Sequence, residues 1–62
     1  MDPEIAWDEF SLALSEGRRE DAGEFAHALG EWLSKGGFIP EGMARQNEGK
    51  TRQDLIEWMG CY

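Results

Sequence analysis

Residues 20–35, EDAGEFAHALGEWLSK, decide the fold of this chain. On a helix that turns by about 100° per residue, their apolar side chains fall within an arc of about 120°. That arc contains Ala22, Phe25, Ala26, Leu29, Trp32 and Leu33. Acidic residues occupy the first turns and Lys35 the end, which is the charge distribution that a helix dipole favours. The stretch therefore predicts an amphipathic helix from about residue 20 to residue 35.

The segment before it predicts a second helix, from about residue 3 to residue 16. Asp2 can accept hydrogen bonds from the first free amides, Pro3 suits the first helical position, and Gly17 suits a C-terminal cap. The main apolar stripe of this helix contains Ala6, Trp7, Phe10, Ala13 and Leu14. Ile5 and Leu12 lie on another side. Two apolar sides on so short a helix indicate that it contacts two neighbours.

The segment after it predicts a loop over residues 36–50 and a short helix from about residue 52 to residue 59. A glycine pair at the start of the loop can end the preceding helix. The loop itself is polar and weakly patterned, with room for one helical turn around Met43. Thr51, followed by Asp54 three residues later, forms a variant of the capping box that begins many helices.

Together these elements predict an all-α fold: an antiparallel helical hairpin with a short third helix packed across it, in one domain over residues 1–62. No stretch alternates between polar and apolar residues as a half-buried strand does. Gly23 and Gly30 lie on one flank of the central helix. Either another backbone passes close to that flank, or the two glycines are neutral.

The chain is short and acidic, with 62 residues, 13 acidic and 6 basic side chains, and a net charge of −7. A domain of this size buries only about 60% of the surface that its unfolded chain exposes, so its stability is marginal. Cys61 is the only cysteine, which excludes an internal disulfide. Of the ways in which small domains are usually stabilised, the sequence leaves binding to a partner or oligomerisation. The negative charge repels phosphate backbones, so we expect no direct binding of nucleic acid.

Nothing in the sequence predicts a membrane protein. No apolar run approaches the roughly 20 residues of a membrane span. The first residues, Met1-Asp2-Pro3-Glu4, are acidic, whereas a signal peptide begins with a basic region. A single thiol also fits a reducing compartment. We therefore expect a cytoplasmic protein.

Three sequence patterns could indicate a metal site, a phosphate site or a reactive thiol, and each has a simpler explanation as an ordinary surface feature. His27 lies with Glu24 and Glu31 on one helix face, but a single helix offers too few ligands for a metal site. Lys50 precedes a helix start, as in a phosphate-binding loop, yet Ala44 stands where that motif requires glycine. The single thiol has no cationic neighbour in sequence that would activate it. We therefore predict no enzyme activity and no cofactor or metal site.

The acidity and the aromatic content predict a non-enzymatic protein–protein interaction module, such as an accessory subunit, an inhibitor or a small regulator. We expect a core this small not to enclose all six tryptophan and phenylalanine rings, and tryptophan is enriched at binding hot spots. We expect either Trp7 or Trp58 to be exposed. The predicted partner-binding residues are Ile5, Trp7, Asp8, Glu9, Leu12 and Trp58. We expect these residues to bind another protein, for which a basic surface is the best complement, or a second copy of the chain in a homodimer.

The same acidity allows an alternative function, that of a phage-type anti-defence protein that mimics DNA and blocks a nucleic-acid-binding partner. The dependence of affinity on salt concentration distinguishes the two functions. Mimicry predicts an affinity that falls steeply with ionic strength, whereas an aromatic interface responds little.

The hairpin partly resembles one tetratricopeptide repeat, with Gly17 and Ala22 at the turn. In the same register, however, Ala6 stands where that repeat has a tryptophan, and Phe10 where it has a small residue. We therefore assign no family from the sequence.

Overall fold

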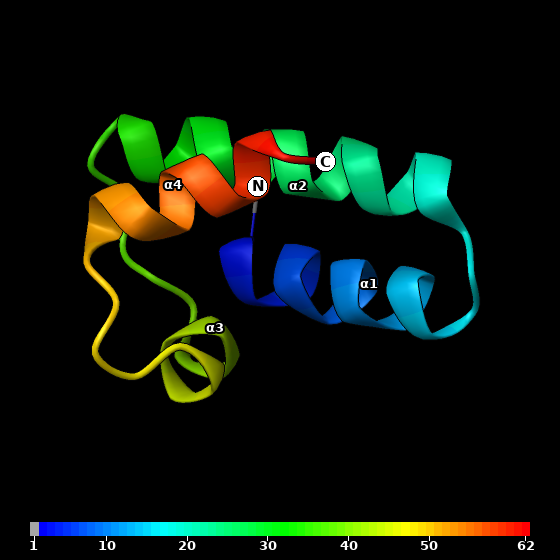
Figure 1. Ribbon diagram of the computed structural model, residues 1–62, viewed down its shortest axis with the longest axis horizontal. Coiled ribbons are helices and arrows are strands. Elements are labelled where there is room, and N and C mark those ends of the chain that lie inside the picture. The colour runs from blue at the N-terminus through cyan, green and yellow to red at the C-terminus, as the bar shows by residue number, and fades with distance from the viewer. Residues whose placement is uncertain (1) are drawn as a thin grey trace.

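The computed structural model describes residues 2–62, which is all of the predicted domain except residue 1. Within this range the chain forms no strand, which confirms the all-α prediction. Its helices are α1 (Pro3–Ser15), α2 (Arg19–Ser34), α3 (Glu41–Gln46) and α4 (Arg52–Gly60) (Figure 1). The three helices expected from the sequence each begin and end within one residue of their predicted bounds.

Helices α1 and α2 form an antiparallel hairpin whose ends are fixed by local capping (Figure 1). The carboxylate of Asp2 accepts a hydrogen bond from the amide of Glu4 at 3.0 Å. Gly17 ends α1 with a φ of 74°, a left-handed conformation that glycine adopts without strain. The amide of Arg18 then donates to the carbonyl oxygen of Ala13 at 2.8 Å, which completes a Schellman motif.

The end of α2 uses the same motif and adds an aromatic contact. The amide of Gly37 donates to the carbonyl oxygen of Trp32 at 3.0 Å. Phe38 folds back so that its ring meets the Trp32 ring edge-on, with 5.7 Å between the centroids. The indole Nε1 of Trp32 donates to the carbonyl oxygen of Phe38 at 2.9 Å. A Cβ atom at Gly37 would overlap the indole, so this approach requires glycine.

The expectation of a loop over residues 36–50 is wrong in part, because residues 41–46 form α3. The local pattern there is weak, and contacts with the rest of the chain account for the helix. Met43 is fully buried, and Gly42 lets α3 approach the Trp7 ring of α1 closely. Helix α4 begins at the predicted capping box of Thr51 and lies beside α2 (Figure 1).

The core draws side chains from all four helices. Its buried apolar members are Ala6, Trp7, Phe10, Ala13, Ala22, Ala26, Leu29, Leu33, Met43, Leu55 and Met59. Leu14 departs from the predicted stripe, because 40% of it is exposed. It lies in the last turn of α1, where Arg19, Ala22 and Tyr62 line the surface beside it. Helices α3 and α4 are at the other end of the hairpin and cannot cover it (Figure 1).

The flank of α2 that carries Gly23 and Gly30 contacts α4 and the residues that follow it. A Cβ atom at Gly30 would lie 3.4 Å from the Cβ atom of Met59, and one at Gly23 would lie 3.5 Å from the carbonyl oxygen of Tyr62. Both are ordinary van der Waals distances. Helix α4 and the residues after it therefore lie directly on this flank, with room for about one methyl group on each glycine.

Candidate functional site: the outer edge of α1 and the groove beside α3

Four of the predicted partner-binding residues share one surface, the outer edge of α1, formed by Ile5, Asp8, Glu9 and Leu12. Ile5 is 59% exposed and Leu12 is 47% exposed. Asp8 is exposed and Glu9 is half-buried. Residues three, four and seven positions apart lie on one side of a helix, so the two aliphatic groups flank the two carboxylates. Both aliphatic side chains are therefore open to solvent over about half of their surface.

The two tryptophans predicted for this surface lie elsewhere. Trp7 is only 5% exposed and Trp58 is half-buried, so the expectation that one of them is exposed is wrong. The ring of Trp7 packs against Phe10, with 5.4 Å between centroids, and against Trp58, with 5.8 Å. Tyr62 meets Phe10 edge-on at 5.1 Å. Only Trp7 and Phe10 of the six tryptophan and phenylalanine rings are buried in the core, and Phe38 is 57% exposed, so the core does not enclose all six rings.

A second feature, the α1–α3 groove, adjoins the outer edge. It has a volume of about 250 Å³ and is lined by Glu4, Trp7, Asp8, Glu41, Gly42 and Arg45. Glu4 and Asp8 are one turn apart on α1, and Glu41 and Arg45 are one turn apart on α3. The Nη2 atom of Arg45 lies 2.6 Å from Oε1 of Glu41. Sequence reasoning missed this groove because its second wall exists only where α3 packs on α1.

Among residues 2–62, no ion pair includes an acidic side chain of α1. Arg18 pairs with Glu16 and Asp21, Lys35 with Glu31, and Arg45 with Glu41. The hydrogen bond that Arg18 donates to Asp21 is the main cause that raises the pKa of Arg18. None of these pairs includes Glu4, Asp8 or Glu9. The negative charge of the outer edge and of the adjoining groove is therefore not neutralised within the described chain.

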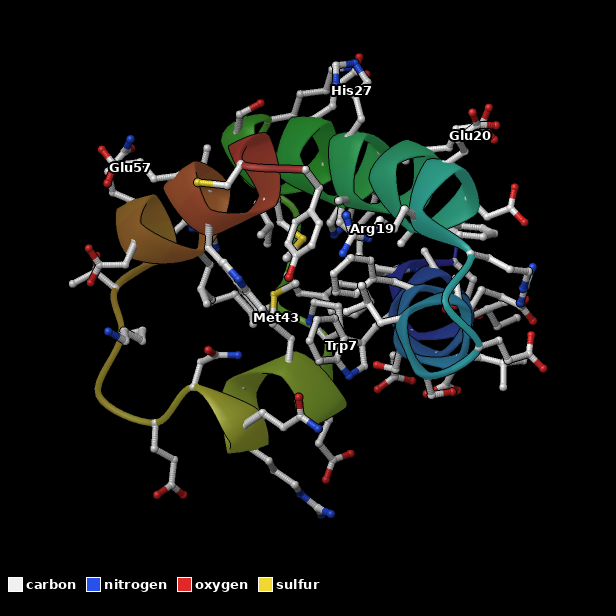
Figure 2. All side chains as sticks on the ribbon, turned by 45° about the vertical axis from the view of Figure 1, so that its right-hand side comes forward. Trp7, Arg19, Glu20, His27, Met43 and Glu57 are labelled. Atoms are coloured by element: carbon white, nitrogen blue, oxygen red, sulfur yellow. The ribbon has the colours of Figure 1, made fainter. Side chains whose placement is uncertain are left out.

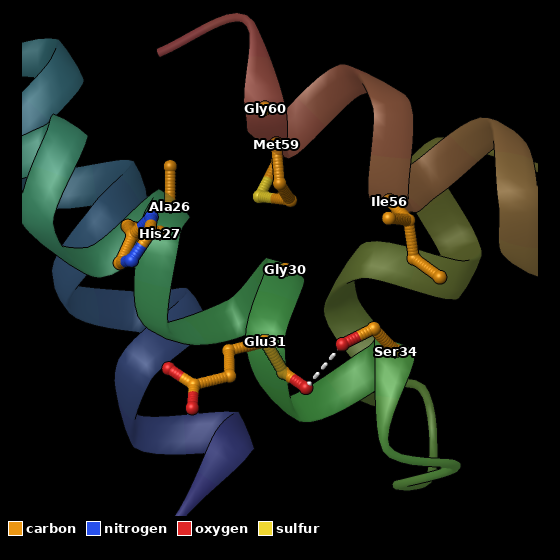
Figure 3. Close-up of a pocket in the computed structure, with 8 residues that line it drawn as sticks. All are labelled: Ala26, His27, Gly30, Glu31, Ser34, Ile56, Met59 and Gly60. Carbon is orange, nitrogen blue, oxygen red and sulfur yellow. Dashed lines mark hydrogen bonds between the residues drawn. The ribbon is translucent and has the colours of Figure 1, made fainter.

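Another groove runs between α2 and α4 (Figure 3). Ile56 and Met59 point into it from α4, and Gly30 lies opposite on α2 (Figure 3). His27 and Glu31 stand at its rim. Because the ammonium of Lys35 donates a hydrogen bond to Glu31, the pKa of this carboxyl is below its ordinary value. The side chains that line the floor offer dispersion contacts but no reactive group.

The metal interpretation of the His27 face finds no geometric support. Among residues 2–62, no three histidine, cysteine or acidic side chains come close enough together to hold a metal ion. Glu31 is already engaged by Lys35 at 3.0 Å. The three side chains of this face are exposed, and the only ion pair among them is the one that Glu31 forms with Lys35.

Comparison with known proteins adds no function. No protein-family model matches this chain, and no curated protein or solved structure is detectably similar to it. No helix within residues 2–62 has both the length and the apolar character needed to cross a membrane.

Proposed function

We propose that this protein is a non-enzymatic interaction module that binds another protein through the outer edge of α1. The observation that carries the proposal is the exposure of Ile5 and Leu12, at 59% and 47%, on either side of two carboxylates. The opposite side of α1 is buried against α2 and α3. Exposed apolar side chains rimmed by charged residues are one feature of protein-interaction surfaces.

Charge defines the class of partner. Asp8 and Glu9 have no ion pair with any described residue, and Glu4 next to them has none either. A partner with lysine or arginine side chains around an apolar contact complements this edge in both respects. The net charge of −7 speeds the encounter with such a partner at low salt.

The reactive groups of the chain support a binding role rather than catalysis. His27 and Cys61 are both exposed, and neither lies at the outer edge. The Sγ atom of Cys61 lies 3.5 Å from the carbonyl oxygen of Glu57, a contact that does not activate a thiol. An exposed free thiol also fits a reducing compartment, so we place the protein in the cytoplasm.

Affinity capture with purified variants tests the proposal. Wild-type protein and an Ile5→Ser, Leu12→Ser double variant are used as baits in an extract of the source cell, with quantitative mass spectrometry of what is retained. We expect one partner to be lost from the double variant. Leu14→Ser is the matched control, because Leu14 is an exposed leucine of the same helix on a different side. Equal retention by all three baits would contradict the proposal.

Repeating the capture across salt concentrations separates the two candidate functions. Exposed charges more than about 8 Å apart are largely screened at physiological salt, whereas apolar contacts are not, so an interface that also contains Ile5 and Leu12 should lose only part of its affinity. A steep loss with salt, together with insensitivity to the Ile5 and Leu12 substitutions, would instead favour mimicry of DNA.

A further inference from the structure

The hairpin of α1 and α2 has one side that no other described helix covers. Helix α4 packs on α2 and helix α3 packs on α1, and both lie on the same side of the hairpin (Figure 2). In this view α4 is at the left and α3 at the bottom, and no ribbon of residues 2–62 lies beyond α1 and α2 at the upper right. The side chains that the hairpin presents there have no second layer of the described chain to pack against.

The glycines of α2 show which of its side chains lie on the uncovered side. The Cβ positions of Gly23 and Gly30 point at α4 and the residues after it. Phe25 and Trp32 each come two residues later, a rotation of about 200° at about 100° per residue, so they lie on the opposite side of α2. Both are half-buried. Phe38 adds an exposed third ring, because it packs edge-on against Trp32.

The same reasoning places Ile5 and Leu12 on the uncovered side of α1. Trp7 faces α3 and α4, since Gly42 lies against its indole and Trp58 packs on its ring. Ile5 comes two residues before Trp7 and Leu12 five residues after it, which rotates them by about 160° and about 140° away from Trp7. The uncovered side therefore carries apolar groups from both helices. We call it the open face and define it by Ile5, Leu12, Phe25, Trp32 and Phe38.

A hollow on the open face has room for one anchoring side chain. It has a volume of about 240 Å³ and is lined by Ala28, Glu31, Trp32 and Lys35. Ala28 precedes Gly30 by two residues, so the hollow is also turned away from α4. Its volume is below the roughly 300–1,000 Å³ of sites for small molecules. The side chains that anchor a protein partner fill hollows of this kind.

The shape of the open face fits a helix. It is the surface shared by two antiparallel helices of 13 and 16 residues, and it is about 20 Å long at 1.5 Å per residue. A third helix packs along such a pair with its ridge of side chains between them, as in helical bundles. An extended peptide that adds a strand needs a sheet edge, and residues 2–62 form no strand.

Charge distinguishes a partner helix from a second copy of this chain. On the α2 border of the open face, Glu31 is paired with Lys35. On the α1 border, neither Asp8 nor Glu9 belongs to an ion pair of the described residues. The uncompensated charge is therefore negative, and lysine or arginine on one flank of the occupant complements it. A second copy has no such flank, because α1, α2 and α4 each contain more acidic than basic residues.

We propose that the open face binds an amphipathic helix of the partner protein. The apolar side of that helix covers the open face, and one of its side chains enters the hollow beside Trp32. Its basic flank lies over Asp8 and Glu9. This inference rests on the proposed function and deepens it, because the outer edge of α1 is one border of the open face. The aromatic side chains of α2 and of the loop after it supply the other border.

A titration of the full chain with a model helix tests the open face without the partner. The probe is a synthetic peptide of about 18 leucine and lysine residues, with leucine at spacings of three and four along one side. Two-dimensional NMR of the ¹⁵N-labelled protein follows the indole N–H signals. We expect a saturable shift of the Trp32 signal, with the Trp7 and Trp58 signals moving less because those rings belong to the other side of the hairpin.

A second peptide separates helix binding from attraction between opposite charges. It has the same composition in an order that spreads leucine around the helix, and its effect on the Trp32 signal should be smaller at every concentration. Equal shifts with the two peptides, a silent Trp32 signal, or a Trp58 shift as large as that of Trp32 would overturn the proposal.

Two variants locate the binding surface. Phe38→Ser should weaken binding of the amphipathic peptide by about fivefold or more, as the loss of an interface hot spot does. Tyr62→Ser is the matched control, because Tyr62 is an aromatic residue of similar exposure that lies against the α4 flank of α2. Equal weakening by the two substitutions would overturn the proposal. A Trp32 shift when the protein alone is concentrated, below the concentration at which the peptide acts, would make a second copy the occupant and also overturn it.

Failure of this inference and failure of the proposed function have different signatures. Phe38→Ser is added as a bait in the affinity capture, where loss of the partner that also depends on Ile5 and Leu12 supports the inference. Full retention of that partner by Phe38→Ser, with no response of Trp32 to the peptide, would overturn the helix-binding face alone. A response of Trp32 to the peptide, without any captured partner that depends on Ile5 and Leu12, would overturn the proposed function alone.

Discussion

The guanidinium of Arg52, the first residue of α4, donates a hydrogen bond of 3.2 Å to the carbonyl oxygen of Leu33 in the last turn of α2. The same Nη1 atom also donates to the carbonyl oxygen of Gly37 just beyond that helix. A cation at a helix C-terminus satisfies free carbonyl groups and complements the helix dipole. The contact therefore fastens the start of α4 to the end of the hairpin.

Arg52→Met should lower the free energy of unfolding by about 1–2 kcal/mol, because two hydrogen bonds from a charged donor are lost at a partly exposed site. Urea denaturation followed by circular dichroism measures the change. Arg45→Met is the matched control, since Arg45 makes only an exposed pair with Glu41, which is worth at most about 1 kcal/mol. Equal effects of the two substitutions would mean that the Arg52 contact does not fasten α4.

Gly42→Ala should destabilise the fold by about 1–3 kcal/mol, as overpacking does. Its Cβ atom would lie 2.7 Å from Nε1 of Trp7, which is buried and cannot move aside freely. Gly23→Ala is the matched control, because its Cβ atom would make only a van der Waals contact of 3.5 Å. That substitution should stabilise by up to about 1 kcal/mol, the gain from replacing glycine inside a helix. The two melting temperatures should therefore move in opposite directions.

Leu29→Ala should cost about 2–5 kcal/mol, the usual effect of truncating a buried leucine. Leu29 has an exposed fraction of 0% and lies in the middle of α2. Chemical denaturation gives the change directly. A midpoint that hardly moves would show that the core does not depend on this side chain.

Glu31 should contribute to stability in a way that depends on pH. Because the hydrogen bond from Lys35 lowers the pKa of Glu31 from 4.5 in the folded state, unfolding takes up protons when the pH falls. The contribution is fully present above the unfolded pKa and is lost as the pH falls through the folded pKa. NMR titration of the Glu31 carboxyl should give a pKa closer to 4.5 in Lys35→Met than in wild type. An unchanged pKa would mean that the pair does not persist in solution.

In the absence of a partner, the outer edge of α1 should pair with its own copy. Burial of Ile5 and Leu12 favours the dimer, and repulsion between the carboxylates of the two copies opposes it. Added salt screens that repulsion, so sedimentation should detect more dimer at higher salt. An Ile5→Glu, Leu12→Glu variant should remain a monomer. If both proteins sediment as the same monomer and melt alike, the homodimer prediction is wrong, while the proposal of a different partner stands.

The sequence by itself determined the features that depend on a few neighbouring residues. Asp2 and Thr51 begin their helices because their side chains reach amides two or three residues away. Gly17 and Gly36 end theirs because they adopt a positive φ. The apolar face of α2 follows from spacing alone. Capping and periodicity act over one or two turns, so a linear pattern contains all the information that they need.

Only the tertiary structure decided which of the apolar residues of α1 are covered. Trp7 is buried because α3 packs on it through Gly42, whereas Leu14 is exposed because α3 and α4 lie at the other end of the hairpin. The α1–α3 groove has the same origin, since its walls come from segments more than thirty residues apart. A helix of six residues is too short to be stable alone. Its existence depends on burying Met43, a long-range contact that no local pattern encodes.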